Sequence, residues 1–197
     1  MTSQAIIFDI GGVLEIAPRL DVGGRWERRL GLDAGEIDTR MATSWKAGTI
    51  GAMSLEEVLV ALEAVIGDHA QAYMEDVWVE YLGTLNVELA EYLRGLRPRY
   101  RTAIVSNSFV GAREREQAAY GFEDLVDHIV YSHEAGVAKP DPRIYHLACE
   151  RLAVRPEEAI FLDDVEAFVE GARGVGMRAV HFRDTAQAIA EIEALLS

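Results

Sequence analysis

Four short apolar runs in this chain each lead into residues that can do chemistry. The first leads into Asp9, the second into Ser106, the third into a loop that carries Lys139, and the fourth into Asp163 and Asp164. Carboxylates that meet at one site repel one another unless a hard cation joins them, and oxygen ligands of this kind favour Mg²⁺. A magnesium ion and a lysine can together hold a dianionic phosphate, and an aspartate in line with phosphorus is then a nucleophile.

Each of these groups also has a simpler explanation when it is taken alone. Asp and Ser are common in turns after strands, and Asp163 with Asp164 would favour the N-terminal dipole of a following helix. A preference for turn residues explains each group alone better than it explains the presence of all four together. No His/Cys cluster with the spacing of zinc ligands accompanies them, which favours magnesium over zinc.

Five runs rich in β-branched and aromatic residues predict buried strands, and amphipathic segments between them predict helices. The strands are expected at 5–10, 102–105, 128–131, 159–162 and 179–182, and the helices at 87–96, 111–120, 142–152, 165–173 and 185–196. This alternation predicts an α/β fold with a doubly wound parallel sheet. Ligands of such sheets bind outside the carboxyl ends of the strands, where the four polar groups lie.

One connection is much longer than the others. Between 11 and 85 the chain has no strand pattern, only helical segments at 22–30, 34–45, 54–66 and 69–81. Ser54 and Glu57 form a capping-box signature at the start of the third segment. We therefore expect a small helical cap domain at 15–85, inserted into a core domain formed by 1–14 and 86–197.

Several residues of the expected cap can be explained by structure alone, without a role in binding a ligand. Residues 45–49 are interpreted as a solvated connection between two helices, although they would be able to reach the substrate. Trp26, Trp78 and Tyr81 fit the apolar faces of cap helices better than a platform for stacking a ligand.

At its polar motifs the chain resembles the haloacid dehalogenase (HAD) superfamily of hydrolases. The segments that carry the resemblance are 6–14, 105–108, 136–145 and 161–172, in the order of that superfamily's four motifs. The inserted helices are similar to its cap between the first and second motifs. The resemblance covers nearly the whole chain and implies a Rossmann-like core, an inserted cap and membership of the phosphatase branch whose first motif reads Phe-Asp-X-Gly.

The resemblance also implies a role for each polar residue. Asp9 would be the nucleophile, and Lys139 would bind phosphate and balance charge. Ser106 and Asn107 would bind the phosphate oxygens. The Mg²⁺ ligands would be Asp9, Asp164 and the backbone carbonyl of Gly11, with Asp163 as a second ligand or a supporting group.

Two positions depart from the pattern of most phosphatases in the superfamily. Gly11 replaces an aspartate that acts as general acid and base, and such catalysis is worth about 10²–10⁴-fold. Phe168 replaces a polar residue near the metal, which would weaken metal binding. A good leaving group, such as the anomeric oxygen of a sugar 1-phosphate, would need less protonation. His133 and Glu15 are candidate substitutes for the lost acid, and both also fit ordinary polar positions.

The sequence therefore predicts a Mg²⁺-dependent phosphatase that hydrolyses a small phosphorylated metabolite, such as a sugar phosphate, through an aspartyl-phosphate intermediate. Gly11 and Phe168 motivate one alternative, a catalytically silent protein that binds phosphate or a partner. A less favoured alternative is the metal-free hydrolysis of 2-haloacids, which has no use for the Asp163–Asp164 pair.

The composition of the chain limits which compartments and which binding partners are expected. The chain has 197 residues, a net charge of −14 and one cysteine, so a reducing compartment is expected. Binding to nucleic acid or anionic membranes would need clustered Lys and Arg, and no apolar run approaches the roughly 20 residues of a membrane span. We expect a cytoplasmic monomer or homodimer whose partner is a small phosphorylated substrate.

Overall fold

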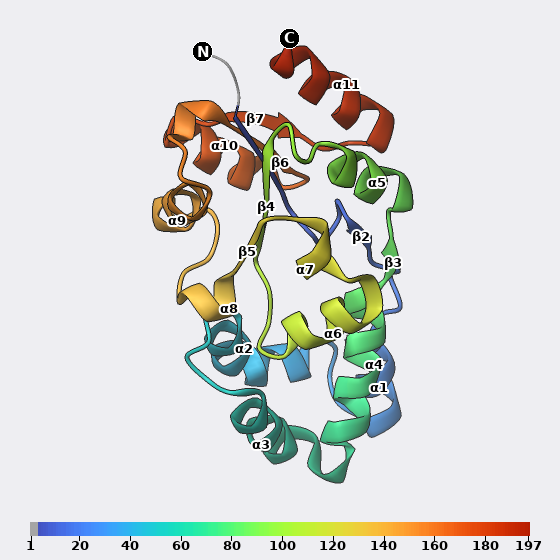
Figure 1. Cartoon of the computed structure of the whole chain (residues 1–197). Coiled ribbons are helices and arrows are strands. Elements are labelled where there is room, and N and C mark those ends of the chain that lie inside the picture. The colour runs from blue at the N-terminus through green and yellow to red at the C-terminus, as the bar shows by residue number, and fades with distance from the viewer. Residues whose placement is uncertain (1–3) are drawn as a thin grey trace.

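The computed structural model describes residues 4–197. Figure 1 shows a central sheet flanked by helices, with further helices gathered beyond one end of the sheet. Residues 1–3 of the expected core segment lie outside the described residues. Within residues 4–197, no helix is both long and apolar enough to cross a lipid bilayer.

Five parallel strands form the central sheet in the order β5-β4-β1-β6-β7. The strands are β1 Ala5–Phe8, β4 Arg101–Ser106, β5 His128–Tyr131, β6 Ala159–Asp163 and β7 Arg178–His181. Each overlaps a predicted run, because strands covered on both faces carry the continuous apolar pattern used to find them. The predicted α/β fold with a parallel sheet is confirmed.

Helices cover both faces of this sheet (Figure 1). On one face lie α9 (Pro142–Leu152) and α10 (Glu166–Gly174), and on the other α5 (Val87–Gly95) and α11 (Thr185–Leu196). The side chains of each strand alternate between the two faces. In β1, Ile6 and Phe8 belong to the cluster under α5 and α11, whereas Ala5 and Ile7 belong to the cluster under α9 and α10.

The remaining core helices lie in the connections that precede and follow β5. They are α6 (Ala112–Tyr120), α7 (Phe122–Leu125) and α8 (Ser132–Ala135). The sequence predicted only the first of these, because the two four-residue helices are too short to show a helical period. A 3₁₀ turn at Pro156–Glu158 precedes β6.

The long connection after β1 folds into four helices with a hydrophobic cluster of their own. They are α1 (Val22–Leu30), α2 (Glu36–Thr49), α3 (Leu55–Ile66) and α4 (Ala70–Leu82), with a 3₁₀ turn at Gly67–His69. The predicted capping box is present, with reciprocal bonds between Ser54 and Glu57. Residues 45–49 were wrongly interpreted as a link between helices, because α2 continues through them to Thr49.

A two-stranded antiparallel sheet joins this helical segment to the core, where no strand was predicted. It pairs β2 (Glu15–Ile16) with β3 (Thr84–Leu85). Two residues per strand are too few to produce an alternating pattern, which explains the error. Gly83 makes the pairing possible, because a Cβ there would lie 2.4 Å from the Ile16 carbonyl oxygen. The division into domains at 14/15 and 85/86 stays a prediction, and these positions fall at the ends of this sheet.

A buried carboxylate of α1 supports the start of α2. Gly35 stands at the N-cap of α2 and offers no side chain. Glu27, which is 4% exposed, instead accepts hydrogen bonds from the backbone N–H groups of Gly35 at 2.9 Å and Ile37 at 3.0 Å. Negative charge at a helix N-terminus also interacts favourably with the helix dipole. Glu27 therefore acts as a capping group supplied from a neighbouring helix.

We expect Glu27→Ala to lower the free energy of unfolding by about 1–3 kcal/mol, because the backbone N–H groups of Gly35 and Ile37 at the start of α2 lose their acceptor, and that of Ile37 is buried. Glu63→Ala is the matched control, since Glu63 is an exposed glutamate of α3. Urea unfolding of both variants measures the difference. Equal stability of the two variants would contradict the capping role.

Candidate active site

The residues predicted to do chemistry meet at the carboxyl ends of three adjacent strands. Asp9 follows β1, Ser106 ends β4 and Asp163 ends β6, and the sheet order places β1 between the other two. Lys139 lies in the loop between α8 and α9. All four side chains belong to residues no more than 5% exposed. The sheet therefore brings together groups that are more than 150 residues apart in the chain.

The ammonium of Lys139 lies between two carboxylates. Its Nζ is 2.6 Å from Asp9 Oδ1 and 2.6 Å from Asp163 Oδ2, and its side chain is fully buried. The rings of Phe161 and Phe168 lie 5.6 and 5.1 Å from Nζ, measured to the ring centroids. Phe168, noted in the sequence as a lost polar group, thus covers the ammonium and keeps water from it.

A third carboxylate completes an acidic cluster. Single oxygen atoms of Asp9, Asp163 and Asp164 all lie within 4.8 Å of one another. Burial raises the pKa of Asp9 above its ordinary value, and Lys139 opposes this effect. Burial and the charge of Asp9 also raise the pKa of Asp164. One ammonium does not balance three carboxylates, so the cluster can accommodate a cation.

Local backbone contacts fix the two aspartates that follow β6. The Val165 N–H donates to Asp163 Oδ1 at 2.8 Å, and the Asp164 carbonyl oxygen lies 2.8 Å from His181 Nε2. Gly12 has φ +78°, and a Cβ there would lie only 2.2 Å from Asp164 Oδ2. This glycine therefore provides both the turn after β1 and the space for the Asp164 carboxylate.

Asn107 makes contacts that the sequence did not predict. Its Nδ2 donates to the Lys139 carbonyl oxygen at 2.9 Å, and the Lys139 N–H donates to Asn107 Oδ1 at 2.7 Å. The amide side chain thus holds the backbone that carries the ammonium. Its expected role in binding phosphate stays a prediction, as does that of Ser106.

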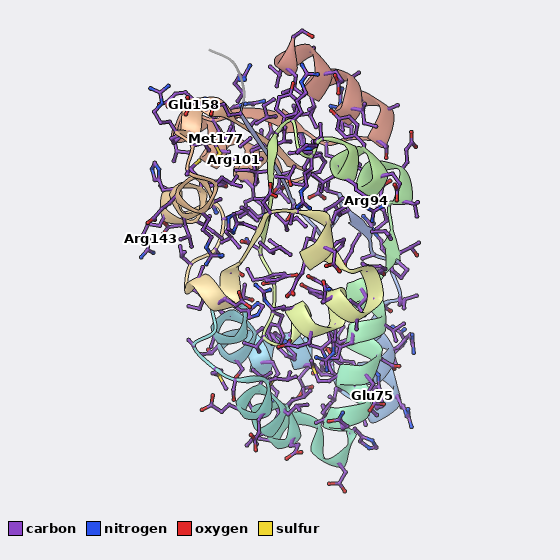
Figure 2. The ribbon with its side chains drawn as sticks, viewed as in Figure 1. Glu75, Arg94, Arg101, Arg143, Glu158 and Met177 are labelled. Carbon is purple, nitrogen blue, oxygen red and sulfur yellow. The ribbon has the colours of Figure 1, made fainter. Side chains whose placement is uncertain are left out.

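Arg143 follows Lys139 closely but does not contribute charge to the site. Figure 2 shows it pointing outward from α9, and its side chain is 75% exposed. Its guanidinium pairs with Asp141, whose carboxylate also caps α9 by accepting from the Arg143 N–H. Lys139 therefore supplies the positive charge at the three strand ends.

Gly11 leaves open space where a general acid would stand. A Cβ built on it meets no heavy atom within 4 Å. Of the two candidate substitutes, His133 is half-buried and its Nδ1 lies 2.6 Å from Ser108 Oγ. Burial lowers the pKa of His133. Glu15 lies in β2, is 2% exposed, and its Oε1 has no hydrogen-bond partner within residues 4–197.

Glu15 is a neutral carboxylic acid over most of the pH range. Burial, then the charges of Glu116 and Asp9, raises its pKa to about 9. Glu116 is also fully buried and accepts a hydrogen bond from the Tyr131 hydroxyl at 2.6 Å. Burial raises the pKa of Glu116 to about 7. Sequence reasoning missed Glu116, because a glutamate in an amphipathic helix usually faces solvent.

Helix α2 is attached to the core beside this site. The Ser132 hydroxyl donates to the Thr49 carbonyl oxygen at 2.7 Å and also accepts from the Ser108 N–H at 2.9 Å. Gly51 passes so close that a Cβ would lie 1.9 Å from the His133 carbonyl oxygen. No sequence signal marks these contacts, since each depends on two loops that meet only in the folded chain.

A family model described as haloacid dehalogenase-like hydrolase matches residues 4–176. The matched range contains every residue of the acidic cluster and Lys139. The chain belongs to the haloacid dehalogenase-like hydrolase family. The family predicted from the motifs is confirmed, and the protein is a hydrolase.

Several curated relatives of this HAD-like hydrolase are phosphatases. Phosphatase MT3486 of Mycobacterium tuberculosis is 31% identical over 195 residues, which cover 91% of this chain and 87% of the relative. D-ribitol-5-phosphate phosphatase of Bacteroides thetaiotaomicron is 25% identical over 87% of each chain. Bifunctional epoxide hydrolase 2 of Sus scrofa is 24% identical over 98% of this chain, but the chain spans only 39% of that relative's length.

Solved structures share the fold of this HAD-like hydrolase. A HAD family enzyme from Bacteroides thetaiotaomicron, in complex with magnesium and inorganic phosphate, matches with a TM-score of 0.82 at 18% identity, over 95% of this chain and 98% of that one. A predicted HAD-like family hydrolase from Porphyromonas gingivalis matches with a TM-score of 0.84 at 24% identity, over 100% and 98% of the two chains.

The raised pKa of Glu15 predicts how stability depends on pH. The folded protein keeps this proton up to about pH 9, whereas the unfolded chain loses it near the ordinary glutamate pKa of 4.5. Unfolding therefore releases a proton between these values, so the contribution of Glu15 to stability falls by up to about 1.4 kcal/mol per pH unit as pH rises. We expect Glu15→Gln, which cannot titrate, to lose stability less steeply than the wild type over this range.

Urea unfolding at several pH values with a chelator present measures both slopes. Glu63→Gln, at an exposed position of α3, is the control and should follow the wild type. Parallel curves for Glu15→Gln and the wild type would show that Glu15 is ionised in the folded protein.

Proposed function

We propose that this protein is a Mg²⁺-dependent phosphatase that hydrolyses a small phosphate monoester through a phosphorylated Asp9. The observation that carries the proposal is the ammonium of Lys139 between Asp9 and Asp163, beside the carboxylate of Asp164. A nucleophilic carboxylate, a fixed positive charge and a cation-binding cluster lie together at one end of the sheet. This combination suits transfer of a dianionic phosphoryl group.

The donor set fits magnesium. Asp9 and Asp164 offer carboxylate oxygens within reach of a common ion, and the backbone carbonyl of Gly11 is the third expected ligand. Both oxygens of Asp163 already accept hydrogen bonds, from Lys139 and from the Val165 N–H. We therefore assign Asp163 the task of orienting Lys139, and Asp164 that of holding the ion. The bound ion would neutralise charge on the phosphoryl oxygens.

The residues of the chain then have separate tasks. One carboxylate oxygen of Asp9 attacks phosphorus, and the bond from phosphorus to the ester oxygen breaks with its electron pair staying on that oxygen. The leaving oxygen takes a proton from water, so that the free alcohol departs. Lys139 and the Ser106 hydroxyl hold the phosphoryl oxygens during the transfer. Water then hydrolyses the aspartyl-phosphate and returns the carboxylate of Asp9.

The names of the relatives support this proposal without defining the substrate. Phosphatase MT3486 supports phosphate release, and the neighbour that binds magnesium and inorganic phosphate supports the metal. The expectation of a sugar phosphate rests on two observations. Gly11 stands where most phosphatases of the family have a general acid, and one relative is named D-ribitol-5-phosphate phosphatase. Neither observation involves a residue that would contact the alcohol part of the substrate.

We expect Asp9→Asn to reduce Mg²⁺-dependent phosphate release from phenyl phosphate by a factor on the order of 10⁴–10⁶, since the variant lacks the nucleophile. The fold should persist, because Lys139 keeps Asp163 as its partner. Phosphate release with and without Mg²⁺ is the measurement, and circular dichroism checks the fold.

Other results of the same assay separate the alternatives. Equal phosphate release by the wild type and Asp9→Asn would exclude a phosphorylated Asp9. Metal-independent chloride release from 2-chloropropionate would favour the dehalogenase interpretation. Binding of phosphate without turnover of any ester would favour a silent binding protein.

The open space at Gly11 allows a test of the missing acid. We expect Gly11→Asp to raise kcat at least ten-fold for benzyl phosphate, an ester of a poorly acidic alcohol, because general acid catalysis is worth about 10²–10⁴-fold. Phenyl phosphate should gain much less, since phenolate needs little protonation. Gly12→Ala is the control, and it should lose activity because its Cβ would displace Asp164. An equal gain on both esters would contradict the proposed reason.

A further inference from the structure

A cavity of about 300 Å³ lies beside the three strand ends. Its walls come from α2, from α4 and from residues 107–109 of the loop after β4. The volume is at the lower end of the range of about 300–1,000 Å³ typical of small-molecule sites. None of the sequence motifs discussed above assigns a function to this cavity.

Aromatic rings from three segments form a continuous wall of this cavity. Trp45 of α2 lies 5.7 Å from Phe109 between ring centroids, and Phe109 lies 6.2 Å from Trp78 of α4. Trp78 in turn meets Tyr81 edge to face at 5.3 Å. From the sequence, Trp78 and Tyr81 were interpreted as residues on the apolar faces of cap helices. This interpretation was incomplete, because both also line the cavity.

Three polar residues of the lining, Asn107, Ser108 and Thr49, already make side-chain hydrogen bonds within the protein. The amide of Asn107 binds the backbone of Lys139, and Ser108 Oγ lies 2.6 Å from His133 Nδ1. The Thr49 hydroxyl donates to the Trp45 carbonyl oxygen at 3.0 Å. The charged lining residue, Asp38, is exposed. A polyhydroxylated group would lose hydrogen bonds to water here, and these three engaged side chains would replace few of them.

One residue connects the cavity to the reacting groups. Asn107 is shared, because it lines the cavity and holds Lys139, whose ammonium pairs with Asp9. A substrate whose phosphate meets Lys139 can therefore extend its alcohol part into the cavity.

We infer that this cavity binds the leaving group of the substrate and that this group is apolar and about the size of an aryl ring system. The inference rests on the proposed phosphatase function and names its substrate class, a phosphate monoester of an apolar alcohol. Aromatic walls favour such a group by burial and by edge-to-face contacts. A sugar phosphate is correspondingly disfavoured.

The test compares esters whose alcohols are all primary, so that the basicity of the leaving oxygen differs little. We expect kcat/KM of the wild type with Mg²⁺ to be at least ten-fold higher for 2-naphthylmethyl phosphate than for ribitol 5-phosphate. Decyl phosphate is a third substrate, which distinguishes a preference for an aryl group from a preference for any apolar chain. Its kcat/KM should be lower than that of the naphthylmethyl ester. This comparison needs no variant, so it does not depend on the folding of one.

Variants then assign the preference to the cavity. Trp45→Leu and Phe109→Leu should each lower the ratio of kcat/KM for 2-naphthylmethyl phosphate to that for ribitol 5-phosphate at least five-fold. Tyr100→Leu is the matched control, because Tyr100 is a half-buried aromatic residue at the opposite end of β4 from Ser106, and the ratio should not change. Thermal unfolding of each variant verifies its fold.

Each outcome supports or overturns a specific statement. Equal or better turnover of ribitol 5-phosphate overturns the inference while leaving the phosphatase intact. A preference for the naphthylmethyl ester that survives both cavity variants overturns the assignment to this cavity. Absence of phosphate release from phenyl phosphate overturns the proposed function itself, and the inference with it.

Discussion

The arrangement of the strand ends depends on the buried ammonium of Lys139. Asp9 and Asp163 both lose hydration on folding, and removing one member of a buried ionic group costs about 3–5 kcal/mol because its partner is left unpaired. A compact ammonium can approach two oxygens at 2.6 Å, where a planar guanidinium would impose its own fork geometry. With Asp164, three negative charges face one positive charge, and a divalent cation would bring their sum to zero.

This local balance explains how a chain of net charge −14 can attract an anionic substrate. Exposed charges more than about 8 Å away are largely screened at physiological ionic strength, whereas buried charges are screened far less. The approach of a phosphate is therefore governed by the few groups at the strand ends. The acidic surface favours solubility and disfavours non-specific binding of polyanions.

The sequence predicted the parts of the fold that repeat a pattern. Buried strands and amphipathic helices carry periodic signals. Three of the five parallel strands, β1, β4 and β6, lead to polar site residues at the same edge of the sheet, so the meeting of Asp9 with Asp163 followed from topology alone. The β2–β3 pair and the two shortest helices were missed because each is shorter than one period of a detectable pattern. The cavity was missed because Trp45, Trp78 and Phe109 are far apart in the chain and have no shared motif.

Four consecutive residues, beginning with the last residue of β4, connect the acidic cluster with the cavity. Ser106 stands at the strand end, Asn107 holds the backbone of Lys139, Ser108 contacts His133 near the attachment of α2, and Phe109 forms a cavity wall. Because these residues are consecutive, a shift of the backbone at one of them would also shift its neighbours. In the proposed phosphatase, a leaving group that displaces Phe109 would therefore act on Lys139 through Asn107. The shape of the substrate and the placement of its phosphate would then be coupled within this one loop.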